Sequence, residues 1–240
     1  MAQRDDKLPT ADATKRAEVD SFLDQVRRMP SVRTEMGRGR LVFALDATAS
    51  REPTWDRASR IQGEMFEATA GLGGLEIQLV FYRGFAECKA SRWMSRAADL
   101  HAAMTMVRCA AGATQIERVL AHAIKEAKAR RIQGLVFVGD AMEESLDTLT
   151  ARAGELSLLG VPAFMFHEGA DPVAGRAFRT VAQITRGAYC PFDLASAGML
   201  RELLAAVAVY AAGGRKALEA HGARAGGAAR LIAAQLGKPG

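Results

Sequence analysis

The feature that most constrains the fold is a set of short apolar segments separated by polar stretches. Residues 41–45 (Leu-Val-Phe-Ala-Leu) are apolar at every position, and a similar pattern returns at residues 75–81, 135–138 and 161–166. A strand that is apolar throughout has to be covered on both faces, which is typical of parallel strands with helices above and below. These segments therefore predict the buried strands of an α/β domain.

Segments with apolar residues at helical spacing alternate with the predicted strands. Thr54 and Ser145 precede two of these segments and are suitable N-cap residues. Strands that alternate with helices predict a doubly wound, mostly parallel sheet with helices on both faces, a Rossmann-like α/β fold. The expected helices cover residues 55–70, 96–109, 115–131, 145–159, 173–185 and 197–212.

One strand is expected to run against the others. Only the short turn at residues 82–84 separates the second apolar segment from the polar-rich stretch 85–93. This interval is too short for a crossover helix, so a hairpin with an antiparallel edge strand is expected. Charged residues such as Glu87 and Lys89 would discourage this edge from pairing with another chain.

The length of 240 residues suits one domain with short extensions. Residues 1–40 are expected to form an N-terminal helical extension, with a helix at 11–28. Residues 41–212 form the predicted α/β domain. Residues 213–240 form a basic tail rich in Gly and Ala, which is expected to be solvated or to contact an acidic partner.

Composition argues against several classes of protein. The pI is about 9.4, but the net charge is only +5 and aromatic residues make up 6% of the chain, so nucleic-acid binding is unsupported. The three cysteines are too scattered for a disulfide framework or a zinc site. Neither a signal peptide nor a membrane-spanning run is visible, so we expect a cytoplasmic protein that does not enter membranes.

Polar oxygen-bearing residues gather where predicted elements end. Asp46, Thr48 and Ser50 follow the first strand directly, Asp140 ends the strand at 135–138, and Thr114 lies in a loop between two helices. Ligands of open α/β sheets bind at the carboxyl ends of the strands. If the two strands are neighbours, two carboxylates and three hydroxyls converge. Such hard oxygen ligands suit Mg²⁺ above all, or Mn²⁺ or Ca²⁺.

The D-x-T-x-S string, the Gly-x-Thr loop and the Asp at the strand end resemble the metal-ion-dependent adhesion site (MIDAS) of von Willebrand factor type A (vWA) domains. The resemblance extends from residue 41 to 212 and is to a stand-alone bacterial-type protein. It implies that Thr48 and Ser50 give hydroxyl oxygens directly to the metal, and that Asp46 and Asp140 act directly or through water. Thr114 would be a ligand or an outer-sphere group, depending on conformation. The family more often has Ser where this chain has Thr48.

The resemblance also implies a binding role. Neutral hydroxyl ligands leave the charge of the cation partly uncompensated, so an open coordination position attracts an Asp or Glu of a protein partner. The expected function is a metal-dependent interaction module, such as an assembly or chaperone-like accessory factor. A partner-binding rim is expected from five residues near the metal loops: Arg51, Trp55, Arg83, Glu143 and Glu144.

Several alternatives stay open at this stage. Trp55 is either an exposed binding residue or a helix residue packed on the sheet, and Glu143 and Glu144 are either a solvated turn or competitors for the metal. No catalytic set is identified. A metal-dependent phosphoester hydrolase would need Glu143, Glu144 or His167 as its base. A third alternative is a vWA scaffold that has lost its metal and binds partners through the basic tail.

Overall fold

The computed structural model describes residues 21, 25, 38–61, 74–192 and 197–224, and these form a six-stranded sheet with the order β3-β2-β1-β4-β5-β6. Five strands are parallel, and β3 runs antiparallel to β2 at the edge. The predicted fold class is therefore confirmed. The strands are β1 Gly39–Asp46, β2 Leu75–Arg83, β3 Glu87–Met94, β4 Gly134–Gly139, β5 Ala163–Glu168 and β6 Ala188–Phe192.

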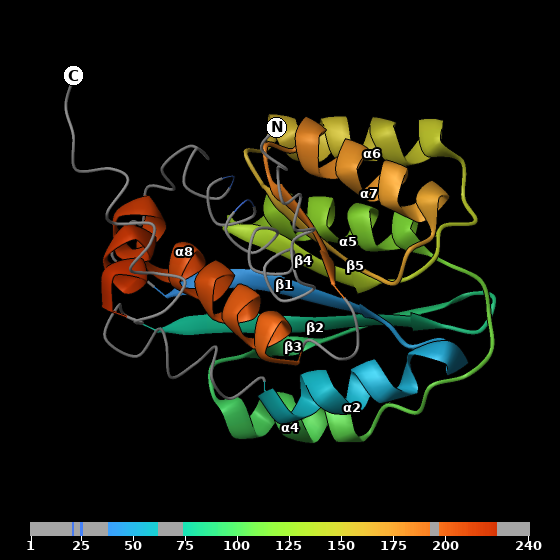
Figure 1. Cartoon of the computed structure of the whole chain (residues 1–240), viewed down its shortest axis with the longest axis horizontal. Helices are drawn as coiled ribbons and strands as arrows, with labels where there is room; N and C mark the ends of the chain where they lie inside the picture. The colour runs from blue at the N-terminus through green and yellow to red at the C-terminus, as the bar shows by residue number, and fades with distance from the viewer. Residues whose placement is uncertain (1–20, 22–24, 26–37, 62–73, 193–196, 225–240) are drawn as a thin grey trace, which may run out of the picture.

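Helices cover both faces of this sheet (Figure 1). One face carries α5, α6 and α7, and the other carries α2, α4 and α8. The bounds are η1 Ala49–Arg51, a 3₁₀ turn, and α2 Glu52–Ile61, α4 Ala97–Thr105, α5 Ile116–Ala129, α6 Leu146–Leu158, α7 Pro172–Ile184 and α8 Ala197–Arg224.

Strand β1 is the centre of the core. All eight of its positions are buried, because it is paired on both edges and covered on both faces. Leu41, Phe43 and Leu45 belong to the cluster under α2, α4 and α8, whereas Val42 and Ala44 belong to the cluster under α5, α6 and α7. This two-sided burial explains why the segment is apolar without interruption.

Of three local helix expectations, the structure overturns one, confirms the position of the second and does not describe the third. Helix α2 begins at Glu52, directly after η1, so Thr54 lies inside the helix and the prediction of Thr54 as N-cap is wrong. Ser145 does occupy the N-cap position of α6, but its side chain makes no capping hydrogen bond. Residues 62–70, expected to continue the α2 helix, lie outside the described residues.

Strand β6 was missed because its sequence is unlike a strand. Pro191 has no amide hydrogen to donate, and a proline within a sheet is confined to an edge strand, which is where β6 lies. Gly187, directly before β6, lies very close to the backbone of β5: a Cβ at this position would lie 1.9 Å from the carbonyl oxygen of Ala163. The absence of a side chain at Gly187 therefore allows β6 to join β5.

The chain beyond the predicted domain is described only in part. The expected helix at 11–28 lies outside the described residues except Ser21 and Gln25, which are both helical. The side-chain oxygen of Gln25 accepts a hydrogen bond from the amide of Tyr189 in β6 (3.3 Å). Helix α8 continues past residue 212 to Arg224, with a break at Gly214, where φ is 69°. Among the described helices, none has the length and apolar character needed to cross a membrane.

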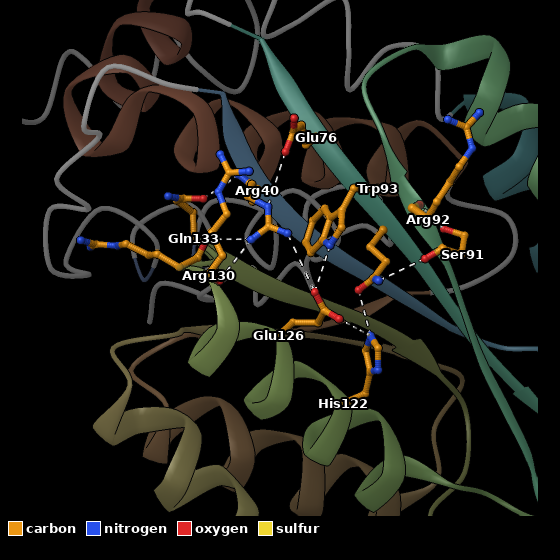
Figure 2. Close-up of polar contacts among 11 residues, drawn as sticks. Arg40, Glu76, Ser91, Arg92, Trp93, His122, Glu126, Arg130 and Gln133 are labelled. Carbon is orange, nitrogen blue, oxygen red and sulfur yellow. Dashed lines mark hydrogen bonds and ion pairs between the residues drawn. The ribbon is translucent and has the colours of Figure 1, made fainter.

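A second polar network, the Arg40 cluster, connects the amino-terminal part of β1 to β2, β3 and α5 (Figure 2). The guanidinium carbon of Arg40 lies 3.8 Å from the centre of the Trp93 ring, and Arg40 Nη1 donates to the carbonyl of Arg130 at 3.2 Å. Trp93 Nε1 donates to Glu126 Oε2 at 3.0 Å. The cluster in Figure 2 also includes Glu76, Ser91, Arg92, His122 and Gln133.

This cluster holds the antiparallel edge strand against α5. His122 Nε2 on α5 lies 2.8 Å from Gln78 Oε1 on β2, and the Gln78 amide nitrogen donates to the carbonyl of Ser91 on β3 at 3.1 Å. Burial lowers the pKa of His122 below its ordinary value of 6.5, although Glu126 acts in the opposite direction. The neutral imidazole is thus the form that the folded protein favours.

The packing of the core predicts the effect of removing a central aromatic ring. Phe137 on β4 is fully buried, stacked on Tyr82 and in edge contact with Phe178. Phe137→Ala is expected to lower the free energy of unfolding by about 3–5 kcal/mol, measured by denaturant titration. Leu158→Ala is the control, because Leu158 is 90% exposed, and it should change the value by less than about 0.5 kcal/mol. Similar losses in both variants would contradict this account of the core.

The Arg40 cluster predicts a pH dependence. Below pH 6.5 the unfolded chain protonates His122 before the folded protein does, because the folded pKa is lowered, so stability falls as the pH falls. Between pH 7.5 and 5, the wild type should therefore lose more free energy of unfolding than His122→Gln, which cannot titrate. Denaturant titrations across this range measure it, and parallel pH curves for the two proteins would refute the assignment.

Candidate metal centre

The candidate site lies at the carboxyl ends of β1 and β4. These strands pair in parallel, with Leu45 opposite Val138, so the residues that follow both strands emerge at the same edge of the sheet. Asp46 is the last residue of β1, and Asp140 follows β4 directly. The two strands are therefore neighbours, as the convergence predicted from the sequence requires.

Hydrogen bonds connect four of the five predicted ligands in a chain. The amide of Thr48 donates to Asp46 Oδ1 at 2.7 Å. Thr48 Oγ1 lies 3.4 Å from Ser50 Oγ, and Ser50 Oγ donates to Asp140 Oδ2 at 3.3 Å. Ser50 is exposed, whereas Asp46 and Thr48 are buried. The arrangement is a line of oxygen atoms that runs from the interior to the surface.

One buried carboxylate oxygen lies at the inner end of this line. Asp46 Oδ2 is buried and, among the described residues, has no hydrogen bond of good geometry, although the Tyr82 hydroxyl interacts with Asp46. Burial raises the pKa of Asp46 above its ordinary value, and the nearby Asp140 raises it further, while the hydrogen bond from Thr48 acts against both. The Tyr82 hydroxyl is also buried, and burial together with its interaction with Asp46 raises the pKa of Tyr82 well above its ordinary value.

Thr114 lies in the neighbouring loop and makes its hydrogen bonds to Glu143. Its amide donates to Glu143 Oε2 at 3.0 Å, and its Oγ1 accepts from the amide of Glu143 at 3.0 Å. Among the described residues, no hydrogen bond joins Thr114 to the other four predicted ligands. The loop is instead placed by the β2–β3 hairpin, because the amide of Ala113 donates to the carbonyl of Gly84 at 3.1 Å.

Glu144 has a role that the sequence did not indicate. Its two carboxylate oxygens accept hydrogen bonds from the amides of Ile116 (2.7 Å) and Glu117 (2.8 Å), the first two residues of α5. These amides have no partner within the helix, and a carboxylate also favours the positive end of the helix dipole. Glu143 and Glu144 thus fasten the loop after β4 to the Thr114 loop and to α5.

Two residues predicted for the partner-binding rim are interior, which corrects that prediction. Arg51 is 2% exposed, and its Nη2 atom forms an ion pair with Glu168 Oε2 at 2.5 Å. Trp55 is 4% exposed, and its Nε1 donates to the carbonyl of Met104 at 3.0 Å. Trp55 therefore follows the packed alternative: it lies with Ala58 on the buried side of α2, and its ring is 6.0 Å from that of Phe81 on β2, centre to centre.

The other rim residues lie nearer the surface. Glu143 is exposed, and the side chain of Arg83 is 26% exposed and paired with Glu87 at 2.9 Å. Phe85, which was not predicted as a rim residue, is 84% exposed beside Gly84 in the hairpin. A large apolar residue directly after a turn glycine was the available signal. Phe85 adds an apolar group close to the loop that carries Thr114.

The donor set fits a hard cation. It combines two carboxylates with hydroxyl oxygens, and one buried carboxylate oxygen without a hydrogen bond of good geometry among the described residues could serve as a ligand or accept from metal-bound water. Within the described ranges, no group of three or more His, Cys, Asp or Glu side chains gathers in a way that could hold a metal. Coordination here would therefore depend on the hydroxyls of Thr48, Ser50 and Thr114.

No family model and no curated protein matches the sequence, but solved structures match the fold. A von Willebrand factor type A protein from Catenulispora acidiphila aligns with a TM-score of 0.60 at 16% identity, over 72% of this chain and 43% of its own. The chain has a vWA fold. Proximal thread matrix protein 1 from the mussel byssus gives 0.59 at 15% identity, over 75% and 48%. The SpRpn10 VWA domain gives 0.55 at 12% identity, over 68% and 94%.

The vWA neighbours bear on the metal only indirectly. A structure of the mussel protein is described as having a zinc-occupied MIDAS motif, and it matches this chain with a TM-score of 0.58 at 16% identity. Identity at this level shows the fold and not the ligand. The chain spans less than half the length of the first two structures, so their other properties are not carried over.

The contacts of Glu144 predict a loss of stability when its charge is removed. Glu144→Gln keeps one acceptor oxygen but loses the second oxygen and the charge at the α5 terminus. We expect the free energy of unfolding to fall by about 1 kcal/mol, measured by denaturant titration. Glu202→Gln on the exposed side of α8 is the control and should have no measurable effect. Equal values for the two variants would show that the cap contributes nothing.

Proposed function

We propose that this vWA-fold chain binds a divalent cation and, through it, an acidic side chain of a protein partner. The proposed ligands are Asp46, Thr48, Ser50, Thr114 and Asp140, and Mg²⁺ is the favoured ion, with Mn²⁺ and Ca²⁺ as alternatives. The observation that carries the proposal is the buried Asp46 Oδ2 atom. Among the described residues it has no hydrogen bond of good geometry, and it lies at the inner end of a line of oxygen ligands.

Each residue contributes differently to such a site. Asp46 is held in place by the amide of Thr48, which leaves its second oxygen available. Thr48 and Ser50 offer neutral oxygens, and Asp140 receives the Ser50 hydroxyl. Thr114 would reach the ion after its hydroxyl leaves the amide of Glu143. The outward end of the line is exposed at Ser50, which is where a partner has access.

The charge balance favours an acidic partner. The hydroxyl ligands add no negative charge, so the charge of a divalent ion is only partly compensated at the coordination position that stays open. When bound, the cation supplies the positive charge to which an outside carboxylate binds. Around it, exposed Phe85 offers apolar contact area and Arg83 offers a partly exposed positive charge. Such a rim would hold a peptide or loop that presents Asp or Glu.

The alternative of a phosphoester hydrolase receives no specific support. Its candidate bases, Glu143 and Glu144, accept hydrogen bonds from backbone amides of the Thr114 loop and α5. His167 is buried, and its Nδ1 lies 3.0 Å from the Tyr189 hydroxyl. That the chain is not an enzyme stays a prediction. A role as an assembly or chaperone-like accessory factor also stays a prediction, since no described contact identifies the partner.

Metal binding at this site predicts a thermal shift. At a Mg²⁺ concentration about 100 times its Kd, the folded state gains about 2.7 kcal/mol, which raises Tm by roughly 5–10 °C for a chain of this size. Asp46→Ala should abolish this response. Asp99→Ala is the control, because Asp99 lies on α4 and pairs with Arg96, away from the metal loops. Equal shifts in wild type and Asp46→Ala, or no shift in either, would refute the metal site.

A pull-down from extract in Mg²⁺ and in chelator then separates the binding modes. We expect the wild type to retain partners in Mg²⁺ but not in chelator, and we expect Asp46→Ala to retain them in neither. Partners retained in chelator but lost on truncation after Arg224, which leaves α8 and its buried Leu218 in place, would instead favour the metal-free scaffold.

A further inference from the structure

Directly beside the candidate metal site lies a cation that the chain itself provides. Arg51 follows Ser50 in the sequence, and its guanidinium group points into the protein, with only 3% of the side chain exposed. Its Nη2 atom pairs with Glu168 Oε2 at 2.5 Å, and its Nη1 atom lies 3.8 Å from Asp140 Oδ2. A fixed positive charge thus lies between a proposed ligand and a second carboxylate.

The strand order explains how these groups meet. Arg51 lies in the turn after β1, Asp140 follows β4, and Glu168 is the last residue of β5. These three strands are consecutive in the sheet and parallel, so their carboxyl ends form one row. The guanidinium group spans this row beneath the surface. Because Arg51 is buried, it contacts these carboxylates rather than a partner.

Arg51 and a divalent ion would act on the same atom. Asp140 Oδ2, which lies 3.8 Å from Arg51, is also the oxygen that receives the Ser50 hydroxyl at 3.3 Å. A fixed cation close to a ligand oxygen repels a second cation, and the repulsion is strong where burial keeps water away. Glu168 holds the guanidinium more closely than Asp140 does, 2.5 Å against 3.8 Å, and so keeps Asp140 accessible.

We propose that Arg51 is a built-in cation that lowers the affinity of this site for divalent metal, and that Glu168 limits this effect by drawing the guanidinium away from Asp140. The inference rests on the proposed metal binding and adds its regulation. Arg51 is a positioning residue, because it acts on the ion through Asp140. In the metal-free protein, Arg51 gives Asp140 a positive neighbour, whereas in the loaded protein it weakens the hold of Asp140 on the ion.

The test is a calorimetric titration of the full chain with Mn²⁺ and, separately, Mg²⁺. Arg51→Met removes the charge and keeps a long side chain, so Kd should fall by about 10- to 100-fold. Glu168→Gln releases the guanidinium toward Asp140, so Kd should rise. Arg92→Met is the control, because Arg92 is an exposed arginine on β3 far from the row of carboxyl ends, and its Kd should stay within about twofold of wild type.

The direction of the change separates this proposal from a structural role. If Arg51 only supported the fold, its loss would weaken metal binding, whereas the proposal requires tighter binding. An unchanged or higher Kd in folded Arg51→Met, with metal still bound by the wild type, would overturn the inference and leave the proposed function standing. If no protein bound either ion, both would fall. Should Arg51→Met fail to fold, Arg51→Lys and Glu168→Gln decide: the former must keep the wild-type Kd and the latter must raise it.

Discussion

The rest of the structure depends on the burial of β1 between two strands and two layers of helices. Every position from Gly39 to Asp46 is buried, so the backbone of β1 has to satisfy its hydrogen bonds within the protein, and it does so mainly through β2 and β4. Charged side chains are therefore confined to its two ends. Arg40 at one end makes its polar contacts within the Arg40 cluster, and Asp46 at the other end is the first residue of the candidate metal site. The strand order that buries β1 also brings Asp140 to the same edge as Asp46.

At that edge, the loops are joined to one another rather than placed independently. The carbonyl of Ala47 accepts from the amide of Ala110 at 3.0 Å, which joins the Asp46 loop to the segment before Thr114. Glu143 and Glu144 fasten the loop after β4 to the same region. A displacement of any one of these loops therefore changes the hydrogen bonds of the others. Since the Thr114 hydroxyl accepts from Glu143, its availability to a metal depends on the loop that carries Asp140.

The sequence was most informative where one physical requirement decided the structure. Two-sided burial marked β1, β2, β4 and β5, and the short hairpin marked β3. The sequence was least informative where contacts between distant segments decided the position of a side chain. Nothing local to Arg51 shows that Glu168 would draw it inward, and nothing local to Glu144 shows that two amides of α5 lie within reach. β6 was missed for the opposite reason: its proline argues against a strand, but its place at the sheet edge makes the missing donor harmless.

The two carboxylates of the candidate site, Asp46 and Asp140, have different surroundings. Asp140 has a buried guanidinium group nearby and remains partly exposed to solvent. Asp46 is buried more deeply, has one oxygen without a hydrogen bond of good geometry among the described residues, and accepts a hydrogen bond from the Thr48 amide. Burial accordingly raises the pKa of Asp46, so its charged form is the costly one. A divalent ion would therefore gain most from Asp46, while Arg51 would determine how much Asp140 adds.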